Sequence, residues 1–270
     1  MDDYGIRLIL TDGVAVVTLD RPARRNAMDQ RMWSGLSEAA GTLAARPPRA
    51  VVVTGAGTAF CAGMDVNPDN PQVAGLLEAV QGHDPAPVRR LIDELARTVR
   101  ALVGLPVPVI AAVNGLAYGG GAELAVSCDL RVLDPSAVIR FSEVRLGLMP
   151  DWGGGVALTR LAGPSAAADL ILTARPVPAP EALALGLANR VSAPGKALEE
   201  ALDLARAMAK NGPRAVRHAL SVIRATPDLP LDQALDLEAR EASDLIASGE
   251  CVHGISAFFE KKEPEFPDAD

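Results

Sequence analysis

The chain of 270 residues is long enough for one large domain with a substantial core, and its 49% hydrophobic and 22% charged residues are typical of a globular protein rather than a disordered one. A net charge of −8 and an aromatic content of 3% argue against nucleic acids and anionic membranes as partners, because both attract basic surfaces. Three cysteines without a CxxC pair and three histidines without metal-ligand spacing predict free thiols in the cytoplasm and no metal site.

The first part of the chain predicts a hairpin, a helix and a strand. Residues 6–10 and 14–19 are apolar runs on either side of an Asp-Gly dipeptide, which is typical of a tight β-hairpin. Residues 28–45 have helical spacing and stop at the breaker sequence RPP. Residues 50–55 form a short apolar run that ends in glycine, and we expect a buried strand there.

The middle of the chain continues to alternate strands and helices. Residues 67–87 are rich in Pro, Gly, Asn and Asp, and they predict a long mobile loop. Residues 101–122 carry no charge, but prolines and glycines interrupt them, so we expect a buried strand and turn rather than a membrane span. Helices are expected at 88–102, from the sequence GGAELAVSCD, at 153–163, 166–173 and 180–186, and strands at 108–115, 129–134, 137–143 and 187–193.

After residue 194 the pattern becomes entirely helical. The helical segments are 197–210, 213–224, 231–247 and 252–262. We therefore expect two regions, an α/β core in residues 1–195 and a helical region in residues 196–270.

The segment VVVTGAGTAFCAGMDV, residues 51–66, places a GAG turn after a strand, as dinucleotide-binding proteins do. The GxGxxG fingerprint needs Gly or Ala at its last position, where this chain has Phe60, and the segment does not open into a helix. A nicotinamide-dependent oxidoreductase is therefore the weaker interpretation. A simple glycine turn leaves the sequence FCAGMD unexplained.

A run of three glycines, Gly119 to Gly121, stands before a single carboxylate, Glu123. Glycines before a helix let the backbone approach a ligand closely and can point amide groups at it. A glutamate in the first turn of a helix is also an ordinary stabilising placement. Because each glycine weakens regular structure, the run favours a site over a purely structural role.

The segment FSEVRLGLMPDWGGG, residues 141–155, adds two more carboxyl groups, Glu143 and Asp151. Carboxyl groups in apolar surroundings suit general acid–base work, because burial raises their affinity for a proton. Asp151 stands just before a glycine run that opens a helix, so its simplest role is that of an N-cap.

Five segments in order carry a resemblance to a known family. RPARRNAM, VVVTGAGTAFCAGMDV, PVIAAVNGLAYGGGAELAVSCDLRV, FSEVRLGLMPDWGGGVALTRLAG and GISAFFEKKEPEF together resemble the crotonase (enoyl-CoA hydratase/isomerase) superfamily over nearly the whole length. The resemblance implies a spiral of ββα turns that forms two roughly perpendicular sheets, followed by a helical oligomerisation region. It also implies a homotrimer or a hexamer of two trimers.

The resemblance assigns roles to five residues. It implies that the amides of Met64 and Gly120 form an oxyanion hole and that Glu123 and Glu143 are the catalytic acids, without saying which is acid and which is base. The implied reaction is the reversible addition of water across the 2,3 double bond of an enoyl-CoA thioester, with no cofactor apart from the coenzyme A of the substrate. Asp151 marks the alternative, a delta3-delta2-enoyl-CoA isomerase or another crotonase-type lyase or hydrolase, in which this aspartate moves a proton.

The resemblance also implies a set of coenzyme A contacts. Asn67 stands where hydratases often have a lysine, so part of this set departs from the family pattern. A catalytically silent CoA-binding protein is expected to lack the acids, so the two glutamates argue for an enzyme. Acyl-chain length, branching and pathway stay open. The implied CoA-binding residues are Arg24, Arg25, Ala62, Asp65, Val66 and Lys261, the last of these often contributed by a neighbouring subunit.

Overall fold

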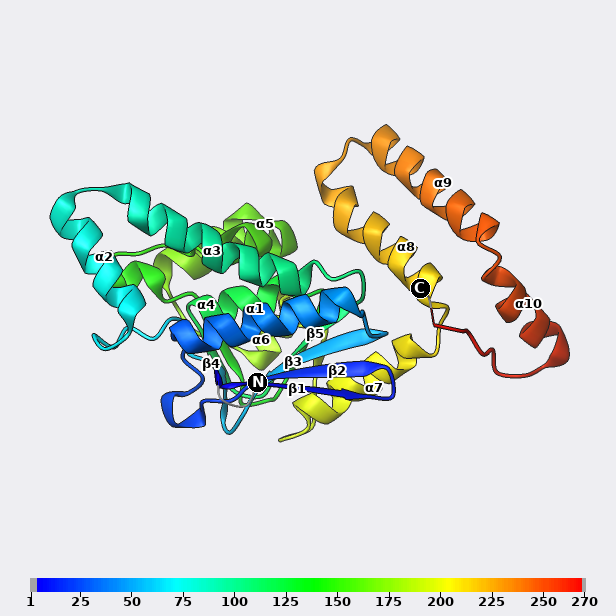
Figure 1. Cartoon of the computed structure of the whole chain (residues 1–270), viewed down its shortest axis with the longest axis horizontal. Helices are drawn as coiled ribbons and strands as arrows, with labels where there is room; N and C mark the ends of the chain where they lie inside the picture. The colour runs from blue at the N-terminus through cyan, green and yellow to red at the C-terminus, as the bar shows by residue number, and fades with distance from the viewer. Residues whose placement is uncertain (1–3, 269–270) are drawn as a thin grey trace.

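A computed structural model describes residues 4–268 and contains two β-sheets (Figure 1). The larger sheet has the strand order β1-β2-β3-β5-β7-β10, in which only the β1–β2 hairpin is antiparallel. Its strands are β1 (Ile6–Thr11), β2 (Val14–Leu19), β3 (Ala50–Gly55), β5 (Val109–Val113), β7 (Leu130–Leu133) and β10 (Arg190–Val191).

The smaller sheet has the order β4-β6-β8-β9, with β9 antiparallel to β8. Three successive strand pairs, β3–β4, β5–β6 and β7–β8, each place one strand in each sheet before a helix follows. This repeat confirms the expected α/β fold with ββα spiral turns. The strands of the smaller sheet are β4 (Ala59–Cys61), β6 (Leu116–Tyr118), β8 (Val138–Arg140) and β9 (Val177–Pro178).

Ten α-helices surround the sheets or extend from them within residues 4–268. They are α1 (Gln30–Ala45), α2 (Pro71–Gly82), α3 (Pro85–Val103), α4 (Gly120–Ser127), α5 (Gly154–Thr173), α6 (Ala179–Ala184), α7 (Ala197–Ala209), α8 (Pro213–Ala225), α9 (Leu231–Ala247) and α10 (Cys251–Glu260). Short 3₁₀ turns occur at Pro22–Arg24, Glu143–Leu146 and Thr226–Asp228.

Strand β3 shows how the larger sheet is buried on both faces. Val51 and Val53 join the main core, to which α1 also contributes, whereas Ala50 and Val52 belong to a second cluster with α7. Successive side chains of a strand point to opposite faces, so this run of valines supplies both layers at once. The helices α1 and α7 accordingly lie on opposite sides of the sheet (Figure 1).

The loop expected at residues 67–87 is wrong, because most of it is helical. Asn70 accepts a hydrogen bond from the amide of Gln72 and caps α2, and Asp84 caps α3 in the same way. Each cap is followed by a proline at the first helical position, where a missing N–H costs nothing. Residues interpreted as loop breakers are therefore helix-start signals.

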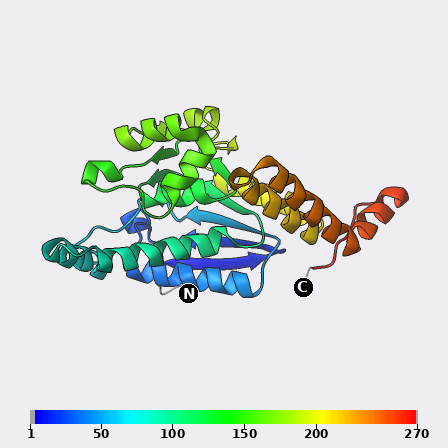
Figure 2. The same ribbon diagram turned by 90° about the horizontal axis from the view of Figure 1, so that it is seen from above.

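The C-terminal helices divide into two groups. The first helix of the predicted region 196–270, α7, packs on the larger sheet and buries Ala201 and Ala205 there. Helices α8, α9 and α10 instead project from the core as an arm, and the chain then returns toward the core (Figures 1 and 2). Arg49 holds the returning segment through Asp268 and the carbonyl of Phe266.

No helix within residues 4–268 is both long and apolar enough to span a membrane. The uncharged stretch 101–122 is divided among α3, β5, β6 and α4.

Candidate active site

The glycine run before Glu123 is explained by close backbone packing. Gly119 has a positive φ of 53°, and a Cβ on Gly121 would lie 2.2 Å from the carbonyl oxygen of Cys61 in β4. Neither position suits a larger residue, because the first needs a left-handed type of backbone and the second has no room. The run therefore brings the start of α4 directly against the loop that follows β4.

Glu123 is buried in the first turn of α4 and is held by backbone amides from the start of α5. Its Oε2 accepts hydrogen bonds from the amides of Trp152 at 2.9 Å and Gly154 at 2.8 Å, and its Oε1 accepts one from Asp151 at 3.2 Å. A Cβ on Gly154 would lie 2.3 Å from the Cα of Glu123, so a glycine is required for this approach. The carboxyl group is thus fixed in place by a segment about thirty residues farther along the chain.

Glu143 lies at the start of the 3₁₀ turn Glu143–Leu146 and is also buried. Within residues 4–268, neither of its carboxyl oxygens has a hydrogen-bond partner. Its Oε1 lies 3.7 Å from where a Cβ of Gly119 would be, so the carboxyl group is beside the glycine run. A buried carboxyl with open hydrogen-bonding capacity suits the binding of a polar group such as water.

Burial raises the proton affinity of both glutamates. Burial, and then the charges of Glu143 and Asp151, raise the pKa of Glu123 to about 8, although the amide of Gly154 opposes the shift. Burial raises the pKa of Glu143 as well, and the charge of Asp151 adds to the shift, although the backbone amide of Glu143 and the neighbouring carboxyl group of Glu123 oppose it. Because the two groups interact, the protons belong to the pair rather than to either residue alone. Such a pair can hold one proton and one negative charge near neutral pH.

Asp151 is a half-buried third carboxyl beside this pair, and burial raises its pKa. The interpretation of Asp151 as the N-cap of α5 is wrong. The helix begins at Gly154, its N-cap is Gly153, and no side chain caps it. Gly153 adopts a positive φ of 101°, so the chain turns between Asp151 and the start of the helix. The backbone amide of Asp151 donates a hydrogen bond to the carboxyl group of Glu123.

The amides of Met64 and Gly120 lie on neighbouring segments. Two backbone hydrogen bonds join Met28 to the loop around Met64: the amide of Met28 donates to the carbonyl of Gly63 at 2.8 Å, and the amide of Asp65 donates to the carbonyl of Met28 at 2.9 Å. Because Met64 lies between the two bonded residues of this parallel bridge, its N–H points away from Met28. A Cβ on Gly63 would lie 3.1 Å from the nitrogen of Gly120. Within residues 4–268, neither the Met64 nor the Gly120 amide donates a hydrogen bond. Two free amides next to a buried acid pair are the elements of an oxyanion hole.

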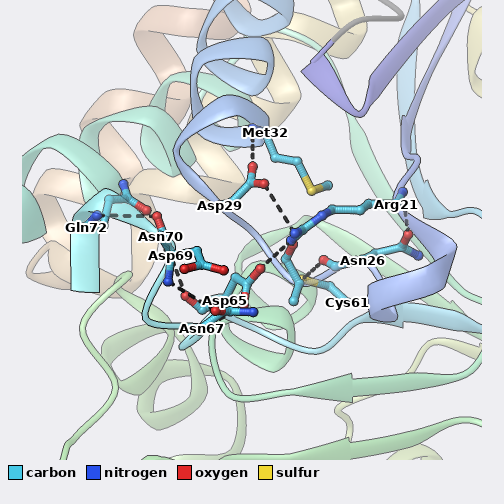
Figure 3. Close-up of polar contacts among 11 residues, drawn as sticks. Arg21, Asn26, Asp29, Met32, Cys61, Asp65, Asn67, Asp69, Asn70 and Gln72 are labelled. Carbon is cyan, nitrogen blue, oxygen red and sulfur yellow. Dashed lines mark hydrogen bonds and ion pairs between the residues drawn. The ribbon is translucent and has the colours of Figure 1, made fainter. Parts of the chain in front are cut away.

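The loop that carries Met64 is braced by Arg21 (Figure 3). Arg21 Nη1 lies 2.6 Å from Asp65 Oδ2 and 3.0 Å from the carbonyl oxygen of Ala27, and Nη2 lies 3.5 Å from Asp29 Oδ2. Asp65 also accepts a bond from the amide of Asn67, and the hydrogen bonds and charge of Arg21 help to hold its pKa below the ordinary value. The arginine therefore ties this loop to the N-cap of α1.

Asn26 braces the preceding turn from inside the core. It is completely buried with a positive φ of 57°, and its amide Nδ2 donates to the carbonyls of Ala56, Ala59 and Phe60. The Sγ of Cys61 lies 3.2 Å from the carbonyl oxygen of Asn26, and burial raises the pKa of this thiol to about 12. The thiol therefore stays neutral and acts as a packing group.

The predicted CoA-binding residues lie in different surroundings. Arg24 lines a cavity of about 330 Å³ together with Arg21 and Asn67. Arg25 has an exposed side chain, and its carbonyl accepts the amide of Ala62 at 3.0 Å.

The other residues predicted to bind CoA differ in whether their side chains are already engaged within the chain. Asp65 is engaged by Arg21, whereas the side chain of Val66 is exposed. Lys261 caps α10 at the far part of the projecting arm, away from the glutamates of its own chain (Figure 1).

Three residues that shape this site were not predicted. Arg21 and Asn26 stand in RPARRNAM on either side of the predicted pair Arg24 and Arg25, and Trp152, whose ring is buried, follows Asp151. The signal for Arg21 and Asn26 was their place in a loop between a hairpin and a helix, where side chains commonly bond to the backbone. Within residues 4–268, no group of three or more His, Cys, Asp or Glu side chains is arranged to hold a metal ion.

Comparison with known proteins shows similarity to one family over nearly the whole chain. Residues 10–269 match the family model described as enoyl-CoA hydratase/isomerase. A putative enoyl-CoA hydratase of Thermus thermophilus is 42% identical over 254 residues, covering 94% of this chain and 97% of that protein. An enoyl-CoA hydratase of Mycobacterium tuberculosis is 36% identical, covering 93% and 92%. A crystal structure of a putative enoyl-CoA hydratase from Streptomyces coelicolor superposes with a TM-score of 0.88 at 35% identity, covering 97% and 94%.

Proposed function

The chain belongs to the enoyl-CoA hydratase/isomerase family, and we propose that it catalyses the reversible addition of water to a 2-enoyl-CoA to give a 3-hydroxyacyl-CoA. The observation that carries this proposal is the buried pair of interacting carboxyl groups, Glu123 and Glu143, beside two free backbone amides. Hydration needs one group that takes a proton from water and one that returns a proton to carbon, and the pair supplies both.

In the proposed reaction the two amides bind the thioester and the two glutamates bind the water. The thioester oxygen is bound by the amides of Met64 and Gly120, which stabilise the enolate that forms when water attacks C3. The water molecule is bound between Glu123 and Glu143. As its oxygen bonds to C3, one carboxylate takes a proton from it, and the other carboxyl group delivers a proton to C2. The reverse sequence removes water from the 3-hydroxyacyl-CoA.

The coenzyme A portion of the substrate is assigned to the basic loop before α1. Arg24 lines the cavity beside Arg21 and offers a cation to phosphate, while Asp65 neutralises Arg21. No further cofactor is needed, because the proton transfers and the addition of water use only side chains and backbone amides.

The experiment that tests the function is a hydration assay on crotonyl-CoA with the wild type and with Glu123→Gln and Glu143→Gln. Each substitution keeps the shape of the side chain and removes its proton transfer, so each is expected to lower kcat by about a hundredfold or more. Retention of wild-type kcat by both variants contradicts the two-carboxylate mechanism.

A second function is favoured by one observation. Asp151 is a half-buried carboxyl whose charge raises the pKa values of both glutamates, so it belongs to the same buried group of acids. A carboxyl in this position can move a proton between C4 and C2 of a 3-enoyl-CoA. Double-bond isomerisation by way of Asp151 is therefore the alternative.

The chain is proposed to assemble as a homotrimer or as a hexamer of two trimers. The arm exposes large apolar side chains, including Phe258 at 77% and Phe259 at 78%, which an isolated chain leaves in water. Sedimentation equilibrium of the wild type tests this, and a monomeric mass contradicts it. Three unpaired cysteines, Cys61, Cys128 and Cys251, suit a reducing compartment, and we propose the cytoplasm.

A further inference from the structure

The ring of Trp152 lies directly against the glycine whose amide is assigned to the oxyanion hole. A Cβ on Gly120 would lie 2.4 Å from each of three carbons of the Trp152 ring, Cε3, Cζ3 and Cη2. Trp152 is 3% exposed, and its own amide is bonded to Glu123. Both ends of the residue are therefore tied to the site, the ring to Gly120 and the backbone to the catalytic carboxyl.

A second indole, that of Trp33 in α1, packs edge-on against the ring of Trp152. The two ring centroids are 4.5 Å apart with the planes at 81°, and Trp33 is 5% exposed. Within residues 4–268, Nε1 of Trp33 is buried without a hydrogen-bond partner. Leaving such a donor unpaired is unfavourable, so this position uses the bulk of the ring rather than its N–H group.

The two indoles occupy the space between the glycine run and α1. Trp33 comes from α1, Trp152 from the segment before α5, and both belong to the main core. The partly buried side chain of Met64 packs on the same core. An acyl chain that extends from C3 toward α1 would have to displace these side chains, and interiors packed at normal density do not yield such a volume without cost.

We propose that Trp152, supported by Trp33, is the specificity-determining residue that closes the acyl side of the site and restricts this enzyme to short-chain 2-enoyl-CoA substrates. The inference rests on the proposed hydratase function. Trp152 does not transfer protons in this scheme. Its ring sets how far the acyl group extends, and its backbone amide, which no substitution removes, continues to hold Glu123.

The test is the ratio of kcat/KM values over crotonyl-, hexenoyl-, octenoyl- and dodecenoyl-CoA. We expect the wild type to lose at least about tenfold from crotonyl-CoA to octenoyl-CoA, because each methylene that does not fit costs a factor of this order. Trp152→Ala should reduce this discrimination by raising kcat/KM for octenoyl-CoA relative to crotonyl-CoA. Trp152→Leu is the second variant if the alanine variant does not fold, as judged by its circular dichroism and melting temperature.

Gly41→Ala is the matched control, because Gly41 lies on the same helix as Trp33, a Cβ there meets no atom within 4 Å, and the residue lies outside the indole pair. We expect it to keep the wild-type order of substrates. Wild-type kcat/KM that is equal for crotonyl-CoA and dodecenoyl-CoA overturns the inference, and so does a folded Trp152 variant with an unchanged profile. If no enoyl-CoA is hydrated at all, the proposed function itself fails, which is a different result from a flat length profile.

Discussion

The amide nitrogen of Gly154 lies 2.8 Å from Oε2 of Glu123, and there is no room for a side chain on that glycine. The contact joins the start of α5 to the first turn of α4, and it places a helix N-terminus against a buried carboxyl group. A helix N-terminus stabilises a negative charge, while burial penalises it. These two effects act in opposite directions on the pKa of Glu123, and the effect of burial is the larger.

Gly154→Ala should separate these two segments. The new Cβ would lie 2.3 Å from the Cα of Glu123, so one backbone segment must move. We expect hydration activity to fall by about a hundredfold, because small displacements of catalytic groups have effects of this size. We also expect the free energy of unfolding to fall by about 1–3 kcal/mol. Steady-state kinetics and urea denaturation measure the two effects.

Gly41→Ala is the control for the glycine prediction. Gly41 lies within α1, and a Cβ there meets no atom within 4 Å. Alanine is the better helix former, so this variant should gain about 0.5–1 kcal/mol and keep its activity. Equal behaviour of the two alanine variants contradicts the role given to Gly154.

Stability should depend on pH through Glu123. Its pKa is raised from 4.5 to about 8 in the folded protein, so the folded state binds this proton more tightly than the unfolded chain does. The resulting stabilisation is complete below pH 4.5 and is lost as the pH rises through about 8. Glu123→Gln removes the titrating group, so its free energy of unfolding should decline less over this range. Identical pH slopes for variant and wild type, measured by urea denaturation, count against the buried, protonated Glu123.

Asp65→Ala should impair the proposed oxyanion hole and leave the two proposed catalytic glutamates unchanged. It removes the partner of Arg21 and of the Asn67 amide, both of which hold the loop beside Met64. We expect kcat to fall by up to about a hundredfold, because the Met64 amide loses its position. Steady-state kinetics should show a fall in kcat with little change in KM, since displacement of an oxyanion donor acts mainly on kcat.

Asp93→Ala is matched to this variant, because Asp93 also pairs with an arginine, Arg89, but on an exposed helix face. An exposed pair at this spacing contributes only about 0.3–0.5 kcal/mol, so kinetics should stay at wild-type values. A wild-type kcat for Asp65→Ala removes the loop anchor from the account.

Asp151→Asn separates hydration from isomerisation. The side chain of Asp151 makes no bond to Glu123, whose Oε1 is bonded by the backbone amide that the variant retains. Hydration of crotonyl-CoA should therefore change by less than about tenfold. Conversion of a 3-enoyl-CoA, if the wild type shows it, should be lost. A large loss of hydration with intact isomerisation contradicts both assignments.

Local patterns in the sequence were sufficient for most of the fold. The valine run of β3 and the periodic spacing of apolar residues in α1 and α9 are strong signals, because each can be recognised within one short segment of the sequence. The helix expected at 88–102 is confirmed by α3, but residues 67–87, which hold α2 and the first turn of α3, were interpreted as a loop, because Asn70 and Asp84 before prolines were taken as breakers. The same pairs are helix caps, and only the downstream spacing distinguishes the two.

The site was predictable where a backbone constraint leaves a mark in the sequence. The glycines at 119 to 121 are such a mark, because contact with Cys61 and a positive φ exclude other residues. The ion pair of Arg21 with Asp65 leaves no such mark, since 44 residues separate them and any arginine of the basic loop could have served. The stacking of Trp152 on Gly120 is likewise a product of tertiary packing.

The most direct test of the account is a crystal structure with a bound 3-ketoacyl-CoA, whose thioester group matches that of the product. The proposed mechanism predicts the thioester oxygen within about 3 Å of the nitrogens of both Met64 and Gly120, with C2 and C3 facing the carboxyl groups of Glu123 and Glu143. A thioester oxygen directed away from both amides, or an acyl group outside the reach of both glutamates, contradicts it.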